Sequence, residues 1–170
     1  QQAISEAVKY GWNGYNLDLE PVAGVEEADA INYAKFIGKF AAALHQKGMK
    51  LNVDTAAWSI LWNYGLISRA LVAEQGDVMI TMGTYTANNT SWLKQLDKVV
   101  AESDSLDKVG IGLMPLDNSD VPISRQDIDF RVARIKEHKI RNVEIWKADQ
   151  QSMSDDSYWW TVLSEFIKDQ

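Results

Sequence analysis

Hydrophobic and polar positions recur with two different periods along the chain, which predicts an alternation of strands and helices. Residues 1–10 have the pattern of the end of a helix. Residues 15–20 alternate strictly between apolar and polar side chains and predict a strand, which Pro21 ends. In residues 26–45 the apolar positions recur every three or four residues, acidic residues begin the segment, and Gly48 follows it. This pattern predicts a helix.

Four more strand-and-helix units follow in the same rhythm. The predicted strands are 50–55, 78–85, 109–114 and 142–146, and the predicted helices are 61–74, 91–102, 125–138 and 158–168. An alternation of this kind, without a repeat of fixed length, is typical of a parallel α/β fold.

Two parallel architectures fit five such units. An open doubly wound sheet would be complete at this length, but no strand is followed by the glycine-rich phosphate loop of nucleotide-binding folds. The alternative is a (β/α)8 TIM barrel, of which residues 1–170 hold only the last five strand-helix units, because a whole barrel takes about 250 residues. An incomplete barrel exposes two sheet edges. We therefore expect N-terminal strands upstream in the same polypeptide or on another chain.

Composition narrows the classes of partner. The 170 residues include 17 Lys and Arg against 24 Asp and Glu, a net charge of −7, and no basic cluster. This balance argues against nucleic acid and anionic membranes as partners, and no apolar run approaches the length of a membrane span, so we predict no membrane insertion. The sequence has no cysteine and two histidines. We accordingly predict no metal and no cofactor.

The first predicted strand carries a row of polar side chains on one face. The two-residue period places Asn16, Asp18 and Glu20 on one face of the strand. The other face carries a row of apolar side chains that ends at Leu19. In a half-exposed strand the polar row would face solvent. In a barrel strand covered by helices the apolar row packs outward and the polar row points inside, with Glu20 at the carboxyl end, where barrel enzymes place their active sites.

These residues also resemble a known family. Residues 13–20 (NGYNLDLE) resemble the D-G-x-D-x-D-x-E signature on the fourth barrel strand of glycoside hydrolase family 18, which contains chitinases and endo-β-N-acetylglucosaminidases. Later segments resemble the next four strands in order: 51–56 (LNVDTA), 82–85 (MGTY), 109–115 (VGIGLMP) and 143–146 (VEIW) with Asp149. The chain departs from the family pattern at Asn13, Asn16 and Thr86, where the family has aspartates, and in one extra residue between Met82 and Tyr85.

The resemblance implies a retaining, substrate-assisted glycoside hydrolase that cleaves β-1,4-linked N-acetylglucosamine in chitin or N-glycan cores. Glu20 would be the acid/base, with a pKa raised by burial and a neighbouring negative charge. Asp18 would hold the acetamido N–H and stabilise the positive intermediate, and Tyr85 would bond the acetamido oxygen. Trp146 would form the floor under a sugar ring, and packing in the core is its alternative.

Four further residues are predicted to bind substrate: Asn16, Asp54, Met82 and Trp58, the last in an outer subsite. Asp54 is either a substrate contact or a structural partner of Asn16. The departures from the family pattern leave an alternative function open: a catalytically inactive chitinase-like glycan-binding or structural protein. Overlapping N-glycosylation patterns at Asn88 and Asn89 predict a secreted, extracellular or lumenal protein.

Overall fold

The computed structural model describes residues 2–21, 23–117, 120–148, 153–154 and 156–169. Asp149 lies outside the described residues. The described chain forms one five-stranded parallel sheet in the order β1-β2-β3-β4-β5. Its strands are β1 (Gly14–Leu17), β2 (Lys50–Thr55), β3 (Val78–Thr81), β4 (Val109–Leu113) and β5 (Asn142–Ile145).

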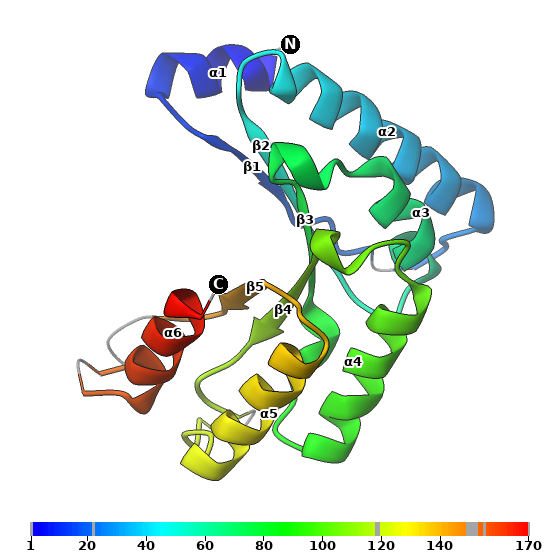
Figure 1. The fold of residues 1–170 in the computed structure, drawn as a ribbon. Helices are drawn as coiled ribbons and strands as arrows, with labels where there is room; N and C mark the ends of the chain where they lie inside the picture. The colour runs from blue at the N-terminus through cyan, green and yellow to red at the C-terminus, as the bar shows by residue number, and fades with distance from the viewer. Residues whose placement is uncertain (1, 22, 118–119, 149–152, 155, 170) are drawn as a thin grey trace.

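The strand order equals the order along the chain, so every crossover advances in the same direction. A doubly wound sheet reverses its strand order at a switch point, and that alternative is therefore wrong. The sheet instead curls into a half-barrel (Figure 1), which agrees with the interpretation of the chain as part of a TIM barrel. Among the described residues, β1 and β5 each pair with only one strand, so the half-barrel has two open edges.

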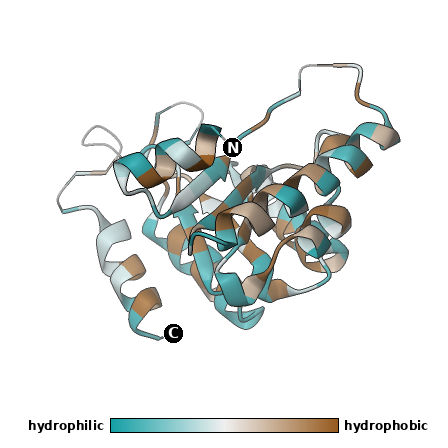
Figure 2. Cartoon of the chain, turned by 90° about the horizontal axis from the view of Figure 1, so that it is seen from above, coloured by the Kyte–Doolittle hydropathy of each residue, from teal (hydrophilic) through white to brown (hydrophobic). Residues whose placement is uncertain are grey.

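Helices cover the convex side of the sheet in an arc (Figure 1). They are α1 (Gln2–Tyr10), α2 (Glu27–His45), α3 (Tyr64–Ala70), α4 (Asn89–Glu102), α5 (Arg125–Glu137) and α6 (Tyr158–Lys168). Short 3-10 turns connect some of them to strands: η1 (Ile60–Trp62), η2 (Ala73–Gln75), η3 (Met82–Thr84) and η4 (Leu106–Lys108). Hydrophobic and hydrophilic residues are interspersed along the helices (Figure 2), as expected for helices with one face on a sheet.

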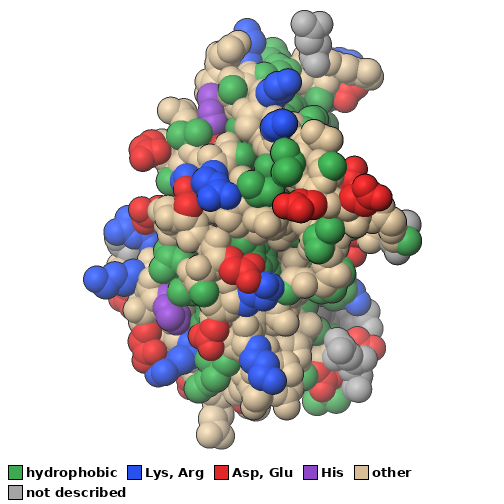
Figure 3. Space-filling view, turned by 90° about the vertical axis from the view of Figure 1, so that its right-hand side faces the viewer, with side chains coloured by type: hydrophobic (Ala, Val, Ile, Leu, Met, Phe, Trp, Pro, Cys, Tyr) green, Lys and Arg blue, Asp and Glu red, His purple; other side chains and the backbone are tan. Residues whose placement is uncertain are grey.

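The core lies between the helices and the convex face of the sheet. Leu51, Val53, Met79, Ile111 and Leu113 are fully buried there. Each alternates along its strand with a residue of the concave face, and that face holds the polar side chains of the site described below. On the outer surface shown in Figure 3, acidic and basic side chains are interspersed. No helix within the described ranges is long and apolar enough to span a membrane.

The first strand is shorter than predicted. It ends at Leu17, so Asp18 and Glu20 lie in the segment that follows β1. Leu19 is 51% exposed and does not pack outward as expected. Among the described strands β1 pairs only with β2, and the paired register ends at Leu17, opposite Val53. The alternation of polar and apolar residues therefore continues past the end of the strand.

Two other predicted elements are interrupted. The strand expected over 78–85 ends at Thr81, where the Thr81 hydroxyl accepts a hydrogen bond from the Gly83 N–H at 3.2 Å and begins η3. The helix expected over 61–74 divides into η1, α3 and η2. The Asn63 side chain caps α3 by accepting from the Leu66 N–H at 2.9 Å. In both places a short polar side chain bonds nearby backbone and redirects the chain.

Candidate active site

A pocket of about 240 Å³ opens at the carboxyl end of the sheet. Its lining combines one residue each of β2 and β5 with residues of the segments that follow β1, β2, β3 and β5: Asp18, Glu20, Asp54, Trp58, Met82, Gly83, Tyr85, Glu144 and Trp146. The lining thus brings together every site residue predicted from the sequence except Asn16. The C-terminal face is also where enzymes with TIM barrels bind their substrates.

Asn16 acts at this pocket through Asp54. The Asn16 side-chain amide donates a hydrogen bond to Asp54 Oδ2 at 2.6 Å. Asp54 is only 6% exposed, and its other oxygen, Oδ1, is buried without a hydrogen-bond partner. The bond supports the interpretation of Asp54 as a structural partner of Asn16.

Tyr85 and Trp146 form an aromatic wall. Their rings stack with centroids 5.7 Å apart and planes inclined by 24°. Trp146 directly follows β5, where its N–H donates to the Leu113 carbonyl at 2.9 Å, and its side chain is 47% exposed. This exposure favours a sugar floor over packing in the core.

The absence of a side chain at Gly112 leaves space for the ring of Tyr85. A Cβ at this position would lie 2.5 Å from Tyr85 Cε1 and 2.6 Å from the Thr81 carbonyl oxygen. The Thr84 hydroxyl donates to the Gly112 carbonyl at 2.7 Å and fixes the turn that carries Tyr85. The tyrosine is therefore positioned by backbone contacts as well as by its stack on Trp146.

Trp58 and Met82 complete the apolar part of the lining. Trp58 is 62% exposed at the rim, and its ring meets the buried Trp62 edge-on at 5.3 Å. Met82 is buried at the start of η3. An exposed tryptophan next to the pocket suits the outer subsite predicted for Trp58.

The acid predicted to be buried is exposed. Asp18 and Glu20 both line the pocket, but both side chains are solvent-accessible because the segment after β1 lies at the open edge of the half-barrel. In the five strand-helix units described, Glu20 is therefore exposed, and its burial stays a prediction for a barrel with further strands.

Sequence reasoning missed one carboxylate, Glu144. The two-residue period of β5 places it on the same face as Trp146, and that period was the signal that could have identified it. Burial raises the pKa of Glu144, and the negative charges of Asp54 and Asp18 raise it further. The pKa of Asp54 is also raised, chiefly by burial and then by Asp18 and Glu20, against the opposing effect of the Asn16 hydrogen bond. The pKa of Tyr85 rises for the same reasons, burial first and Glu144 second.

Replacing Glu144 with Gln is expected to stabilise the protein at neutral pH. Because the pKa in the folded state lies above the ordinary value of 4.5, the native state holds the proton more tightly than the unfolded chain. The contribution of Glu144 to the stability of the wild type therefore declines as the pH rises from about 4.5 through the folded-state pKa. Urea unfolding across this range should give curves that coincide at low pH and separate above it in favour of the variant. Coinciding curves at neutral pH would contradict the prediction, and the exposed Glu74→Gln serves as control.

Replacing Asn16 with Asp is expected to destabilise the protein by about 1–3 kcal/mol at neutral pH. The change replaces a donor, 2.6 Å from Asp54 Oδ2, with a second carboxylate, and two adjacent carboxylates cannot both ionise without cost. Stability should recover as the pH falls and the pair takes up a proton. Asn13→Asp, the same change at the residue before β1, is the control. Equal stability of the Asn16 variant and the wild type at neutral pH would mean that the bond to Asp54 contributes nothing.

Solved structures share this architecture. A chitinase from Chromobacterium violaceum matches with a TM-score of 0.73 and 15% identity, over 96% of this chain and 69% of its own. The catalytic domain 2 of the group II chitinase from Ostrinia furnacalis matches with a TM-score of 0.73 and 9% identity, over 99% of this chain and 70% of its own. The fold is that of a partial TIM barrel.

The PgaB glycoside hydrolase domain from Bordetella bronchiseptica has a more distant barrel, with a TM-score of 0.52 and 15% identity over 92% of this chain and 49% of its own. No protein-family model matches the sequence, and the search of curated proteins finds no match. Likeness at these identities establishes the fold alone.

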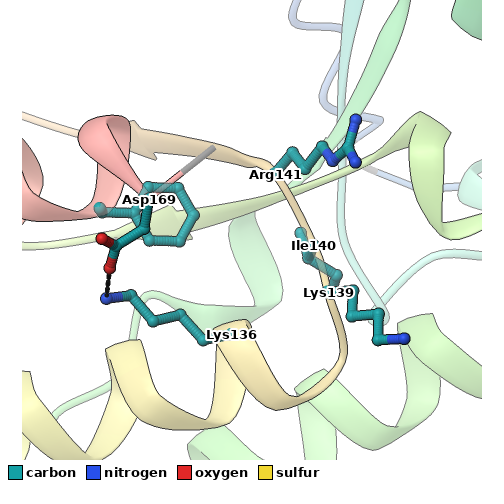
Figure 4. Close-up of a pocket in the computed structure, with 6 residues that line it drawn as sticks. Lys136, Lys139, Ile140, Arg141 and Asp169 are labelled. Carbon is teal, nitrogen blue, oxygen red and sulfur yellow. Dashed lines mark hydrogen bonds and ion pairs between the residues drawn. The ribbon is translucent and has the colours of Figure 1, made fainter.

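Within the described residues, no three His, Cys, Asp or Glu side chains lie close enough to hold a metal ion. A separate pocket of about 300 Å³ lies next to the start of β5. Its Lys136 is paired with Asp169 at 2.6 Å, while Lys139 and Arg141 point away from that pair (Figure 4).

The two candidate glycosylation positions have different structural roles. Asn88 caps α4, since its side-chain oxygen accepts from the Ser91 N–H at 3.0 Å. The Asn89 side-chain nitrogen, the atom that a glycan would modify, donates to Asp127 at 2.6 Å. Asn88 is exposed whereas Asn89 is half-buried and hydrogen-bonded through its nitrogen, so Asn88 is the more accessible of the two.

Proposed function

We propose that this protein is a retaining, substrate-assisted glycoside hydrolase that cleaves β-1,4-linked N-acetylglucosamine in chitin or N-glycan cores. The observation that carries the proposal is the convergence of Asp18, Glu20, Tyr85 and Trp146 on one pocket of a barrel that solved chitinases share. Residues far apart in the sequence meet where a barrel enzyme binds its substrate.

In the first step, the Glu20 carboxylic acid donates its proton to the glycosidic oxygen as the bond to the anomeric carbon breaks. The acetamido oxygen of the same sugar attacks that carbon, so the substrate supplies the nucleophile and one enzyme acid suffices. Asp18 accepts a hydrogen bond from the acetamido N–H and stabilises the positive charge of the cyclic intermediate. Tyr85, whose raised pKa keeps it protonated, donates to the acetamido oxygen.

In the second step, the Glu20 carboxylate takes a proton from water, and the water oxygen attacks the anomeric carbon from the face that the leaving group left. The acetamido group is released and the configuration is retained. Trp146 stacks under the sugar ring throughout, and Trp58 extends the binding surface beyond the pocket. This chemistry uses no metal and no cofactor.

The proposal includes a completed barrel. Three further parallel strands, from the same polypeptide or another chain, would pair with the open edges of β1 and β5 and enclose Glu20. Secretion and a glycan on Asn88 are part of the same proposal.

The test uses the whole natural polypeptide with chitin oligosaccharides and an N-glycan core, with reducing ends measured as product. Tryptophan fluorescence in the same samples reports binding through Trp58 and Trp146. Formation of reducing ends supports the hydrolase. Saturable binding without product would support the second candidate, a glycan-binding protein, which the asparagines at 13 and 16 and the threonine at 86 favour.

A further inference from the structure

A guanidinium group is buried between α4 and α5, close to the segment that carries Tyr85. Arg131 of α5 is fully buried, although both helices lie on the outside of the half-barrel (Figure 1). Burial lowers the pKa of Arg131, against the opposing effect of the negative charge of Asp127. Among the described residues, its Nη1 has no hydrogen-bond partner. A buried cation with an unpaired donor costs free energy, so net stabilisation alone does not account for it.

The other nitrogens of Arg131 hold the connection between η3 and α4. Nη2 donates to the Ala87 carbonyl oxygen at 2.8 Å, and Nε donates to Asn89 Oδ1 at 3.0 Å. Ala87 lies in that connection, and Asn89 is the first residue of α4. The Asn89 side-chain nitrogen in turn donates to Asp127 at 2.6 Å. A planar guanidinium holds two acceptors in one fixed geometry, which a lysine ammonium on its flexible stem does not reproduce.

The other end of the same segment is anchored on β4. The Thr84 hydroxyl donates to the Gly112 carbonyl oxygen at 2.7 Å. Tyr85 therefore lies between an anchor on β4 and an anchor on α5, the second at Ala87, two residues farther along the chain. The Tyr85 ring stacks on Trp146 and lines the pocket. A segment fixed at both ends limits the positions that this ring can take.

We propose that Arg131 is a positioning residue of the active site, which holds the segment 85–88 so that Tyr85 keeps its place on Trp146 and against the substrate. Arg131 is not one of the residues that line the pocket, so it acts through Tyr85. A misplacement of about 1 Å can cost about 100-fold in rate, which is why a distant anchor matters. The inference rests on the proposed function in that Tyr85 takes part in hydrolysis.

The first test is a double-mutant cycle on the whole natural polypeptide. Arg131→Lys keeps the charge and loses the two-point contact, while Tyr85→Phe keeps the ring and loses the hydroxyl. We expect Arg131→Lys to lower kcat/KM for chitin oligosaccharides about tenfold when Tyr85 is present, and less than about twofold in the Tyr85→Phe background. A purely structural role would give equal losses in both backgrounds, and that result would overturn the inference.

The second test is hydrogen exchange, which needs no turnover. The Tyr85 N–H donates to the Met82 carbonyl and the Thr86 N–H to the Thr84 carbonyl, each at 2.9 Å. In Arg131→Lys we expect these two amides to exchange about tenfold faster, while the amides of β2, elsewhere in the sheet, keep the wild-type rate. Unchanged exchange at residues 85–86, or an equal rise throughout the chain, would overturn the inference.

Two further variants complete the experiment. Arg131→Met has a side chain of similar length without a buried charge, and it should give the same results if the lysine variant does not fold. Arg134→Lys is the control, because Arg134 lies one turn farther along α5 and pairs with Glu137. It should leave hydrolysis and exchange at residues 85–86 unchanged. Absence of product from the wild type would contradict the proposed hydrolase, whereas the exchange rates would still decide whether Arg131 holds Tyr85.

Discussion

Replacing Glu20 with Gln is expected to lower the rate of hydrolysis by about 10²- to 10⁴-fold, the range that a positioned general acid/base contributes. Glutamine keeps the shape of the side chain but carries no transferable proton, so neither protonation of the leaving oxygen nor activation of water can proceed. Binding should persist, because the aromatic wall of Tyr85 and Trp146 is unchanged. Reducing-end release and tryptophan fluorescence measure the two effects in the same samples.

The matched control for this prediction is Glu27→Gln, the same change at an exposed position in the first turn of α2. It should hydrolyse at the wild-type rate. A Glu20 variant that loses only a few-fold in rate would remove Glu20 from the role of acid, whatever other residues contribute. Loss of both binding and activity would point instead to a structural role for the segment after β1.

Replacing Gly112 with Ala is expected to destabilise the protein by at least 1–3 kcal/mol, the range for overpacking in a filled interior. The new methyl group would lie 2.5 Å from Tyr85 Cε1 and 2.6 Å from the Thr81 carbonyl oxygen. The tyrosine ring can move away, but the backbone of β3 is held in the sheet. Relief of the clash therefore displaces Tyr85 from its stack on Trp146, and we expect activity to fall with stability.

Denaturant unfolding measures the stability change, and Gly38→Ala is its control. In α2, a Cβ at position 38 would meet Ala70 at an ordinary contact distance of 3.7 Å. An alanine in the middle of a helix is favoured over glycine by roughly 0.5–1 kcal/mol, so this variant should be as stable as wild type or slightly more stable. A Gly112 variant with unchanged stability would mean that the packing around Tyr85 is looser than its contacts indicate.

The raised pKa values of the pocket carboxylates make the stability of the protein depend on pH. Glu144 and Asp54 have raised pKa values for the same primary reason, burial on the concave face of the sheet. The Glu144→Gln variant tests one consequence of that burial, greater stability at neutral pH.

The sequence by itself determined the order and type of the elements and most of the candidate site. Periodicity is a local property, so the two-residue period of 15–20 and the helical period of 26–45 could be detected without knowledge of the fold. The family-like segments placed Asp18, Glu20, Tyr85 and Trp146 at the ends of predicted strands, and the parallel order of the sheet brings those ends together.

Only the tertiary structure decided where each strand ends and what each polar group meets. Pairing with a neighbouring strand, which depends on register, ends β1 at Leu17 and leaves Glu20 exposed at an open edge. The contact between Asn16 and Asp54, and the place of Glu144 in the pocket, join residues on different strands. The physical reason is that burial and hydrogen bonding depend on neighbours in space, whereas the pattern along the chain reports only neighbours in sequence.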